Sequence, residues 1–228
     1  MKKIIPFLLI FGALNMSCGK AKKEEPVKPE PKKVSNVVKP APAPASVKPD
    51  RPKKDVAVIS TMFGDMVIEF FDGNAPKHVE SFKLHARSGY YDGTLFHRVI
   101  PGFMIQGGDP NTRKKNKANY GSGGHAAKYY GYGKENDPES WTLPAEFGDI
   151  KHTRGIVSMA RSTSPSSGGS QFFICAGNAP HLNGQYTVFG QVVEGDQVIE
   201  QIVNLPRDAR DNPNRRVEMK VHLEKRDK

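Results

Sequence analysis

Cysteine is scarce in this chain: Cys18 and Cys175 are the only two among 228 residues. Two cysteines exclude a disulfide framework, a CxxC redox motif and a zinc site built on cysteine ligands. The sequence also lacks a GxxxxGK phosphate loop, a GxGxxG fingerprint, a GxSxG nucleophile elbow and an HExxH metal motif. These absences argue against the common nucleotide-dependent, serine hydrolase and metalloprotease classes. We expect neither a metal nor a cofactor.

Excess positive charge is also missing from most of the chain, although the formal net charge is +10. Residues 1–19 hold two lysines and no acid, and residues 20–54 hold eleven basic and four acidic residues. Residues 55–228 are nearly balanced, with 21 basic and 20 acidic residues. A nucleic-acid-binding domain is expected to carry its own basic face. The charge distribution therefore argues against a nucleic-acid partner.

The first eighteen residues have the pattern of an export signal. Lys2 and Lys3 precede an apolar run over residues 4–14, which is shorter than the roughly 20 residues of a membrane-spanning helix. Ser17 then precedes Cys18, and the arrangement resembles a bacterial lipoprotein signal. That resemblance implies a lipidated Cys18 and a membrane anchor in the bacterial cell envelope. An ordinary cleaved signal and an uncleaved anchor are the alternatives.

Residues 19–54 have the composition of a disordered tether. They are rich in proline and lysine, contain no aromatic residue and show no hydrophobic period. In a polyproline II conformation, about 36 residues reach roughly 110 Å. We interpret the segment as a spacer, and contact of its basic residues with anionic lipid or wall polymers is the alternative. Gly19 is not the Asp that commonly retains lipoproteins in the inner membrane, which favours a periplasm-facing outer-membrane location.

Residues 55–228 have the patterns of one folded domain. Two β-rich runs at 56–61 and 66–71 flank a turn that contains glycine, and they predict a hairpin. Helical spacing predicts one helix from Pro76 to about Arg87 and a second helix after Gly195. Further strand-like runs lie at residues 155–160, 171–175, 187–193 and 217–223. Many short strands and two helices predict a mainly β fold, a closed barrel with helical plugs.

The segment FHRVIPGFMIQGGD, which begins at Phe96, combines a charge with apolar strand residues. Alternation places Arg98 on the same face as Phe96 and Ile100, where a charged group is costly unless it is paired or used. Beyond a Pro-Gly turn, Met104 and Gln106 share one face of the next strand. A guanidinium, an amide and apolar walls suit the binding and polarisation of a neutral group, since no nucleophile or obvious general base accompanies them.

Four ordered blocks resemble the cyclophilin-type peptidyl-prolyl cis–trans isomerases. They are FHRVIPGFMIQGGD at 96–109, GIVSMAR at 155–161, GSQFFI at 169–174 and HLNGQYTVFGQVVEG at 181–195. The similarity extends from about Val56 to Leu223 and is greatest to bacterial members. It implies a closed eight-stranded antiparallel β-barrel capped by two α-helices, and an enzyme that accelerates rotation of X–Pro bonds. The implied partners are proline-containing polypeptides, and we expect a monomer.

The same resemblance assigns Arg98 as the catalytic arginine. Further positions correspond to the walls and polar groups of the substrate site: Phe103, Met104, Gln106, Ala160, Arg161, Gln171, Phe173, His181, Leu182 and Tyr186. The glycine-rich stretch 121–124 is expected beside the groove. His181 stands where many eukaryotic members have a Trp that is important for cyclosporin A binding, and Tyr186 stands where many have His. Isomerase activity is expected, whereas the departure at His181 argues against strong cyclosporin A binding.

Two other functions and one loop stay open. The chain could be a proline-peptide-binding scaffold or holdase whose isomerase activity is incidental, or a structural wall-linking lipoprotein. Arg98 favours the enzyme, because a pure binder has no need of it. The stretch 111–141 is longer than in minimal family members. We interpret it as a solvated surface loop, with selection of partners or substrates as the alternative.

Overall fold

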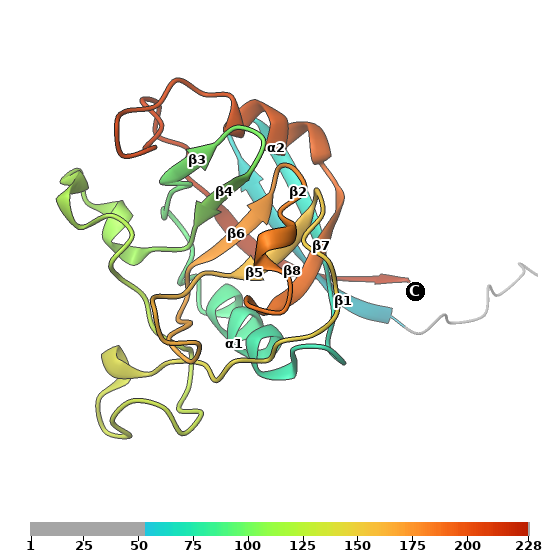
Figure 1. Cartoon of the computed structure of the whole chain (residues 1–228), viewed down its shortest axis with the longest axis vertical. Helices are drawn as coiled ribbons and strands as arrows, with labels where there is room; N and C mark the ends of the chain where they lie inside the picture. The colour runs from blue at the N-terminus through green and yellow to red at the C-terminus, as the bar shows by residue number, and fades with distance from the viewer. Residues whose placement is uncertain (1–52, 228) are drawn as a thin grey trace, which may run out of the picture. The chain divides into compact units, whose positions relative to one another are not determined.

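The computed structural model describes residues 53–227 (Figure 1). The predicted signal, the lipidation site at Cys18 and most of the predicted tether lie outside the described residues. The predicted boundary at residue 54 is wrong by two residues, since Lys53 and Lys54 already pair with Asp227 and Arg226 as the start of the first strand. Within residues 53–227, no helix combines the length and apolarity needed to cross a membrane.

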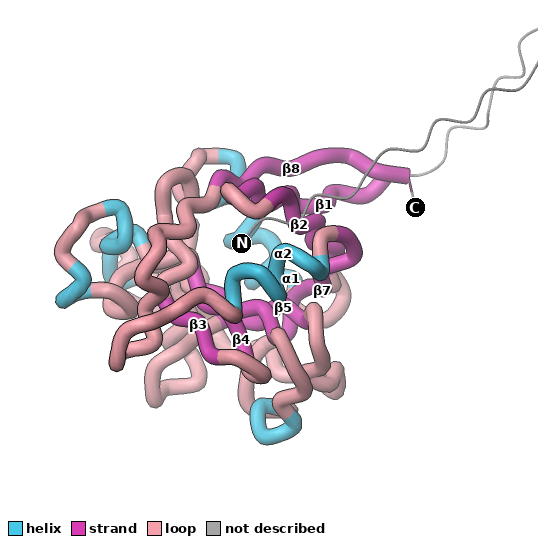
Figure 2. Tube along the Cα trace, turned by 90° about the horizontal axis from the view of Figure 1, so that it is seen from above, coloured by secondary structure: helices cyan, strands magenta, loops and turns pink. Residues whose placement is uncertain are grey.

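Eight antiparallel strands form one curved sheet, and two α-helices lie at its two opposite openings (Figures 1 and 2). The strands are β1 Lys53–Thr61, β2 Gly64–Phe70, β3 Arg98–Ile100, β4 Met104–Gly107, β5 Ile156–Met159, β6 Phe172–Cys175, β7 Val188–Glu194 and β8 Lys220–Asp227. The helices are α1 Pro76–Arg87 and α2 Asp196–Val203, and the 3-10 turns are η1 Pro110–Arg113, η2 Lys117–Asn119, η3 Pro138–Ser140 and η4 Pro180–Leu182. The mainly β class, the hairpin and both helices are confirmed.

Closure of the barrel is not confirmed. The strand order is β3-β4-β6-β5-β7-β2-β1-β8, which leaves β3 and β8 at the two ends. The segments before these strands meet at one isolated bridge between Leu95 and Glu218, and the Phe96 amide donates to the Val217 carbonyl oxygen over 3.0 Å. Strand β8 begins at Lys220 although the apolar pattern begins at residue 217. Irregular backbone contacts therefore bridge the gap where two paired strands were expected.

The helix boundaries follow from local chemistry. Pro76 occupies the first turn of α1, where a missing N–H costs nothing. Gly195 precedes α2 with a φ of +87°, and a Cβ at this position would lie 2.1 Å from the Asp65 carbonyl oxygen. Only glycine tolerates both that conformation and that approach. Phe82 on α1 packs against the rings of Phe172 and Phe189, with centroids 5.4 and 5.5 Å away.

A second, smaller core cluster packs against Ile100 at the end of β3. It contains Met104, Phe173, Cys175, Leu182 and Val188, all buried. Cys175 is fully buried, and burial raises the pKa of its thiol to about 12. Burial of Cys175 confirms the prediction that it is a small core hydrophobe. Its thiol stays protonated and therefore has little nucleophilic character.

Candidate functional site

The pairing of β3, β4 and β6 aligns three of the predicted site residues in one row. Arg98 lies opposite Gln106, and Gln106 lies opposite Phe173. Val99, between Arg98 and Ile100, is fully buried in the main core, so the side chains on either side of it face away from that core. Residues directly opposite each other in antiparallel strands lie within side-chain contact distance. The sheet therefore brings a guanidinium, an amide and an aromatic ring together.

The predicted face of Phe96 is wrong. Phe96 is 1% exposed and packs in the main core with Val99, whereas Ile100 packs against the smaller cluster. The alternation fails because β3 begins only at Arg98, and residues 96–97 are not in a strand. Arg98 is the first residue of β3, and it shares a face with Ile100 as predicted but not with Phe96.

A pocket of about 210 Å³ lies over this row. It is lined by Arg98, Phe103, Met104, Gln106, Ala160, Arg161, Phe173, Leu182 and Tyr186, all of which were predicted from the sequence. The ring of Phe173 meets that of Tyr186 edge-on at 5.8 Å, and the Arg161 guanidinium lies 4.5 Å from the Tyr186 ring centroid. Apolar side chains share the lining with the charged Arg98 and Arg161 and with the polar groups of Gln106 and Tyr186. We call this space the proline pocket, after the ligand that the family resemblance implies for it.

The remaining two predicted residues lie beside the proline pocket. His181 is exposed, and its ring centroid lies 5.4 Å from that of Phe103, so it belongs to the rim. Gln171 lines an adjoining pocket, also about 210 Å³, that shares Gln106, Ala160 and Arg161 with the first. The two pockets therefore form one continuous groove.

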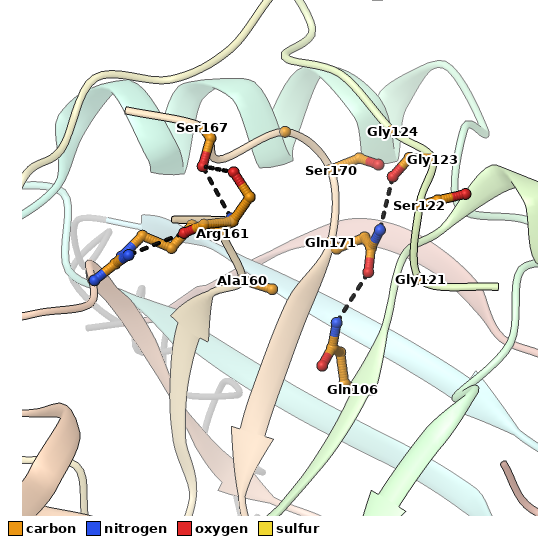
Figure 3. A pocket seen from close by; sticks show the side chains of 12 residues that line it. Gln106, Gly121, Ser122, Gly123, Gly124, Ala160, Arg161, Ser167, Ser170 and Gln171 are labelled. Atoms are coloured by element: carbon orange, nitrogen blue, oxygen red, sulfur yellow. Dashed lines mark hydrogen bonds between the residues drawn. The ribbon is translucent and has the colours of Figure 1, made fainter. Parts of the chain in front are cut away.

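An amide relay connects the proline pocket to the glycine-rich stretch 121–124 (Figure 3). The Gln106 side-chain amide donates to Gln171 Oε1 over 2.9 Å, and Gln171 Nε2 donates to the Gly123 carbonyl oxygen over 2.7 Å. The family resemblance implies that both glutamines hold the substrate backbone and position the arginine. Among the described residues, their side-chain hydrogen bonds run to each other and to Gly123, and none runs to Arg98.

Hydrogen bonds to the Asp109 side chain fix the start of the glycine-rich stretch. This buried carboxylate accepts the Gly121 amide over 2.6 Å and the Asn111 amide over 2.8 Å. A Cβ at Gly123 would lie 2.5 Å from Asp109 Oδ1, so only glycine fits there. Asp109 closes the sequence block that begins at Phe96, yet its role as the acceptor for these two amides was not predicted.

Asp211 is the anion nearest to Arg98, and the sequence reasoning missed it. Its Oδ2 lies 3.7 Å from Arg98 Nε, and its Oδ1 lies 3.1 Å from Arg207 Nε. The Asp211 carbonyl oxygen also accepts the Val99 amide over 2.9 Å. Asp211 has a φ of 63°, the one positive value among the described non-glycine residues. Asp adopts this left-handed conformation more readily than most residues do, and no pattern in the sequence marks the position.

His152 supports the proline pocket from behind. Its ring stacks on Phe173 at 6.1 Å with an interplanar angle of 18°, and its Nε2 lies 3.1 Å from Ser158 Oγ. Burial lowers the pKa of His152 although the Asn183 side chain opposes that effect. The His152 ring is therefore neutral and packs behind Phe173, and it does not line the pocket. Within residues 53–227, no three His, Cys, Asp or Glu side chains cluster as a metal site would require.

Residues 56–223 match the family model described as cyclophilin type peptidyl-prolyl cis-trans isomerase. The chain belongs to this family. A relative from Brucella abortus, described as a probable peptidyl-prolyl cis-trans isomerase, is 43% identical over 149 residues, which are 65% of this chain and 71% of the relative. One from Arabidopsis thaliana is 42% identical over 157 residues, which are 68% of this chain and 86% of the relative. The domain is thus a peptidyl-prolyl cis–trans isomerase, and the predicted enzyme class is confirmed.

Solved cyclophilin structures support the fold assignment. A cyclophilin-type isomerase from Cryptosporidium parvum, crystallised in the presence of the dipeptide Ala-Pro, is 34% identical with a TM-score of 0.64. The match covers 74% of this chain and 98% of that chain. A protein that consists of little more than this domain therefore folds alone, and residues 53–228 are a suitable fragment for solution measurements.

Proposed function

We propose that Arg98 stabilises the twisted X–Pro amide while the proline pocket holds the pyrrolidine ring. A planar amide shares its nitrogen lone pair with the carbonyl group, so rotation has a barrier of about 18–20 kcal/mol. Rotation localises that lone pair on the proline nitrogen. A guanidinium hydrogen bond to this nitrogen, or to the turning carbonyl oxygen, favours the twisted amide over both planar forms. Such differential stabilisation accelerates the reaction without an acid, a base or a metal.

The row of Arg98, Gln106 and Phe173 is the observation that supports this mechanism. It places a charged donor beside an apolar wall, as a substrate with one polar bond and one hydrocarbon ring requires. The Ala-Pro dipeptide added to the crystals of the Cryptosporidium relative is consistent with a proline-containing substrate. The remaining predicted positions act as walls or as holders of the peptide backbone in this proposal.

Arg98 does not account for the whole rate enhancement. An acceleration of 10⁵ requires about 7 kcal/mol of transition-state selectivity. A hydrogen bond to a charged group contributes about 1.5–3 kcal/mol. Contact with Phe173 and Met104, together with removal of water from the amide, has to supply the rest.

The proposed substrates are exported proteins, and the proposed location is the periplasmic face of the outer membrane. This part of the proposal rests on the sequence of residues 1–54, with a lipidated Cys18 and a spacer that holds the enzyme off the membrane. Metabolic labelling with an alkyne fatty acid tests it. We expect label on the full chain and none on Cys18→Ala, which fractionates with soluble protein. An unlabelled full chain would contradict the anchor and leave the isomerase assignment untouched.

The mechanism is tested by NMR exchange spectroscopy of an X–Pro peptide with residues 53–228. We expect Arg98→Ala to lower kcat/KM by about 10-fold to about 150-fold, the range set by one charged hydrogen bond. Arg210→Ala removes an exposed arginine outside the proline pocket and serves as the matched control. A well-folded Arg98→Ala with unchanged exchange would refute the role of Arg98. Slow exchange with the unmutated domain would instead favour the proline-binding scaffold.

A further inference from the structure

Arg161 lies where the two parts of the groove meet, because it lines both the proline pocket and the adjoining pocket. It follows β5, which ends at Met159, by two residues. The residue is partly buried, yet within residues 53–227 no carboxylate lies within 4.0 Å of its guanidinium. A charged group that leaves water needs other partners. The partners that Arg161 has therefore define what its side chain does.

Backbone carbonyl oxygens from two separate segments hold the Arg161 guanidinium. Its Nε donates to the Gln185 carbonyl oxygen over 3.0 Å, in the connection between η4 and β7. Its Nη1 donates to the carbonyl oxygens of Ser162 and Thr163 over 2.9 and 3.3 Å. A guanidinium is planar and presents its donors in a fixed fork. Bonds from two of its nitrogens therefore fix its plane as well as its position.

The fixed guanidinium lies over the ring of Tyr186, which is a wall of the proline pocket. The Arg161 Cζ is 4.5 Å from the ring centroid, within the roughly 6 Å at which an aromatic face attracts a cation. The Tyr186 ring also meets Phe173 edge-on at 5.8 Å. Within the described chain no hydrogen bond holds the Tyr186 side chain. Packing, in which Arg161 takes part, therefore positions the ring.

These contacts commit the Arg161 side chain to the wall of the groove and not to the substrate. Figure 3 shows the side chain directed away from the Gln106 and Gln171 amides. Rotation toward a bound amide would break the bonds of Nε and Nη1 and uncover the aromatic ring. The Arg98 guanidinium is not held in this way, since its closest carboxylate oxygen lies 3.7 Å from its Nε. The two arginines of the proline pocket therefore differ in role.

We propose that Arg161 is a positioning residue, which holds the Tyr186 ring in place as a wall of the proline pocket. The inference rests on the proposed function of that pocket. A wall contacts the pyrrolidine ring in the planar and twisted forms of the substrate alike, so it contributes equally to the ground state and the transition state. Loss of such uniform binding raises KM and leaves kcat unchanged. Arg161 and Arg98 are thereby distinguishable, because loss of Arg98 lowers kcat.

The contact is tested first without substrate, by NMR of ¹⁵N-labelled residues 53–228. The Arg161 Nε–Hε signal is identified by its absence in Arg161→Ala. We expect this proton to exchange slowly with water, because the Gln185 carbonyl oxygen accepts it. The signal should also lie upfield, since protons above an aromatic face are shielded, and Tyr186→Leu should abolish that shift. An Hε signal with the position and exchange rate of free arginine would overturn the proposal.

The kinetic test is a double-mutant cycle in NMR exchange spectroscopy with an X–Pro peptide. We expect Arg161→Ala to raise KM about five-fold, the upper range of an exposed cation–π contact, with little change in kcat. Tyr186→Leu should raise KM as well. Adding Arg161→Ala to it should have little further effect, because the arginine acts through the ring. Arg161→Lys should resemble Arg161→Ala, since a compact ammonium cannot supply both the Nε and the Nη1 bonds.

Arg113→Ala is the matched control. Arg113 also lies over a tyrosine, 5.5 Å from the Tyr90 ring centroid, and its Nε donates to the Asp92 carbonyl oxygen over 3.1 Å. It lines neither the proline pocket nor the adjoining pocket. Its loss should therefore leave both KM and kcat unchanged. Urea unfolding of the same samples shows that each variant is folded.

The proposal is overturned by an unchanged KM in a well-folded Arg161→Ala, by a fall in kcat in place of the rise in KM, by additive effects in the double variant, or by an equal rise in KM in Arg113→Ala. Full activity of Arg161→Lys would also overturn it and assign the positive charge a direct role at the substrate. Slow exchange with the unmutated domain would contradict the proposed function instead. The affinity for the dipeptide Ala-Pro, measured by NMR titration, then replaces KM in the same cycle.

Discussion

Replacement of Gln171 tests whether the glycine-rich stretch contributes to catalysis. In Gln171→Leu, two hydrogen bonds are lost, the 2.9 Å bond from Gln106 and the 2.7 Å bond to the Gly123 carbonyl oxygen. Each has a net value of about 1 kcal/mol, and both groups stay partly accessible to water, which limits the cost. We therefore expect a loss of about 1–2 kcal/mol both in stability and in transition-state binding. The latter corresponds to a fall in kcat/KM of about 5-fold to about 30-fold.

A second substitution separates the two bonds. Gln171→Glu keeps an acceptor for Gln106 but places a carboxylate oxygen against the Gly123 carbonyl oxygen, where Gln171 Nε2 now donates. Two acceptors repel each other, so we expect the glycine-rich stretch to move and kcat/KM to fall at least as far as in Gln171→Leu.

The assay is NMR exchange spectroscopy with an X–Pro peptide, accompanied by urea unfolding of the same samples. Gln191→Leu, on the exposed face of β7, is the matched control and should leave both quantities unchanged. If Gln171→Leu loses stability while kcat/KM stays within two-fold of the unmutated domain, the relay is only structural. That result would refute the proposed coupling between the proline pocket and Gly123.

Three further predictions concern groups away from the reacting amide. Burial holds the pKa of Cys175 at about 12, so residues 53–228 should resist a thiol reagent at pH 8 and react fully in urea. Burial lowers the pKa of His85 to about 4, below the roughly 6.5 of the unfolded chain. The free energy of unfolding is therefore fully retained above pH 6.5 and decreases as the pH falls toward 4, because the unfolded chain then binds a proton that the folded domain does not. Urea unfolding should show about 2 kcal/mol of this loss at pH 5, and less in His85→Gln. In Gly169→Ala, the new Cβ would lie 2.7 Å from the Gly124 carbonyl oxygen, so we expect a loss of about 1–3 kcal/mol in stability and a raised KM.

Each of these has a contradicting outcome. Rapid labelling of Cys175 in the folded domain would show that β6 opens readily. An identical pH dependence in His85→Gln and in the unmutated domain would assign the acid sensitivity to other buried histidines, such as His97. Gly73→Ala is the control for Gly169→Ala, because a Cβ at Gly73 meets nothing within 4 Å. Equal effects of the two glycine substitutions would contradict the steric argument.

The sequence predicted local structure well wherever pattern and local chemistry agree. Alternation in β1 and β2, the proline at the start of α1 and the glycine before α2 each depend on neighbours within a few residues. The position of Arg98 opposite Gln106 was also accessible, because a short Pro-Gly turn fixes the register of β3 and β4. The prediction for Phe96 failed because alternation was extended to two residues that precede the three-residue strand β3.

The contacts that were missed join segments far apart in the chain. Asp211 meets Arg98 across more than one hundred residues, and Gln171 meets Gly123 across 48. No local pattern reports such pairs, because they depend on how two connections fold back over the sheet. The same holds for barrel closure, where an apolar pattern at residue 217 predicts burial correctly but does not determine whether the backbone pairs with β3.

Asp211 places a constraint on how Arg98 works. At 3.7 Å from Oδ2, the guanidinium is attracted by the carboxylate, yet its Nε makes no hydrogen bond to it within 3.5 Å. A tight bidentate pair would use the donors that the twisted amide needs, whereas a free arginine would lose more side-chain entropy on binding substrate. An anion at this distance restrains the side chain and leaves donors free. The consequence is that Asp211→Asn should lower kcat/KM less than Arg98→Ala does, and a loss equal to that of Arg98→Ala would assign Asp211 a direct role at the substrate.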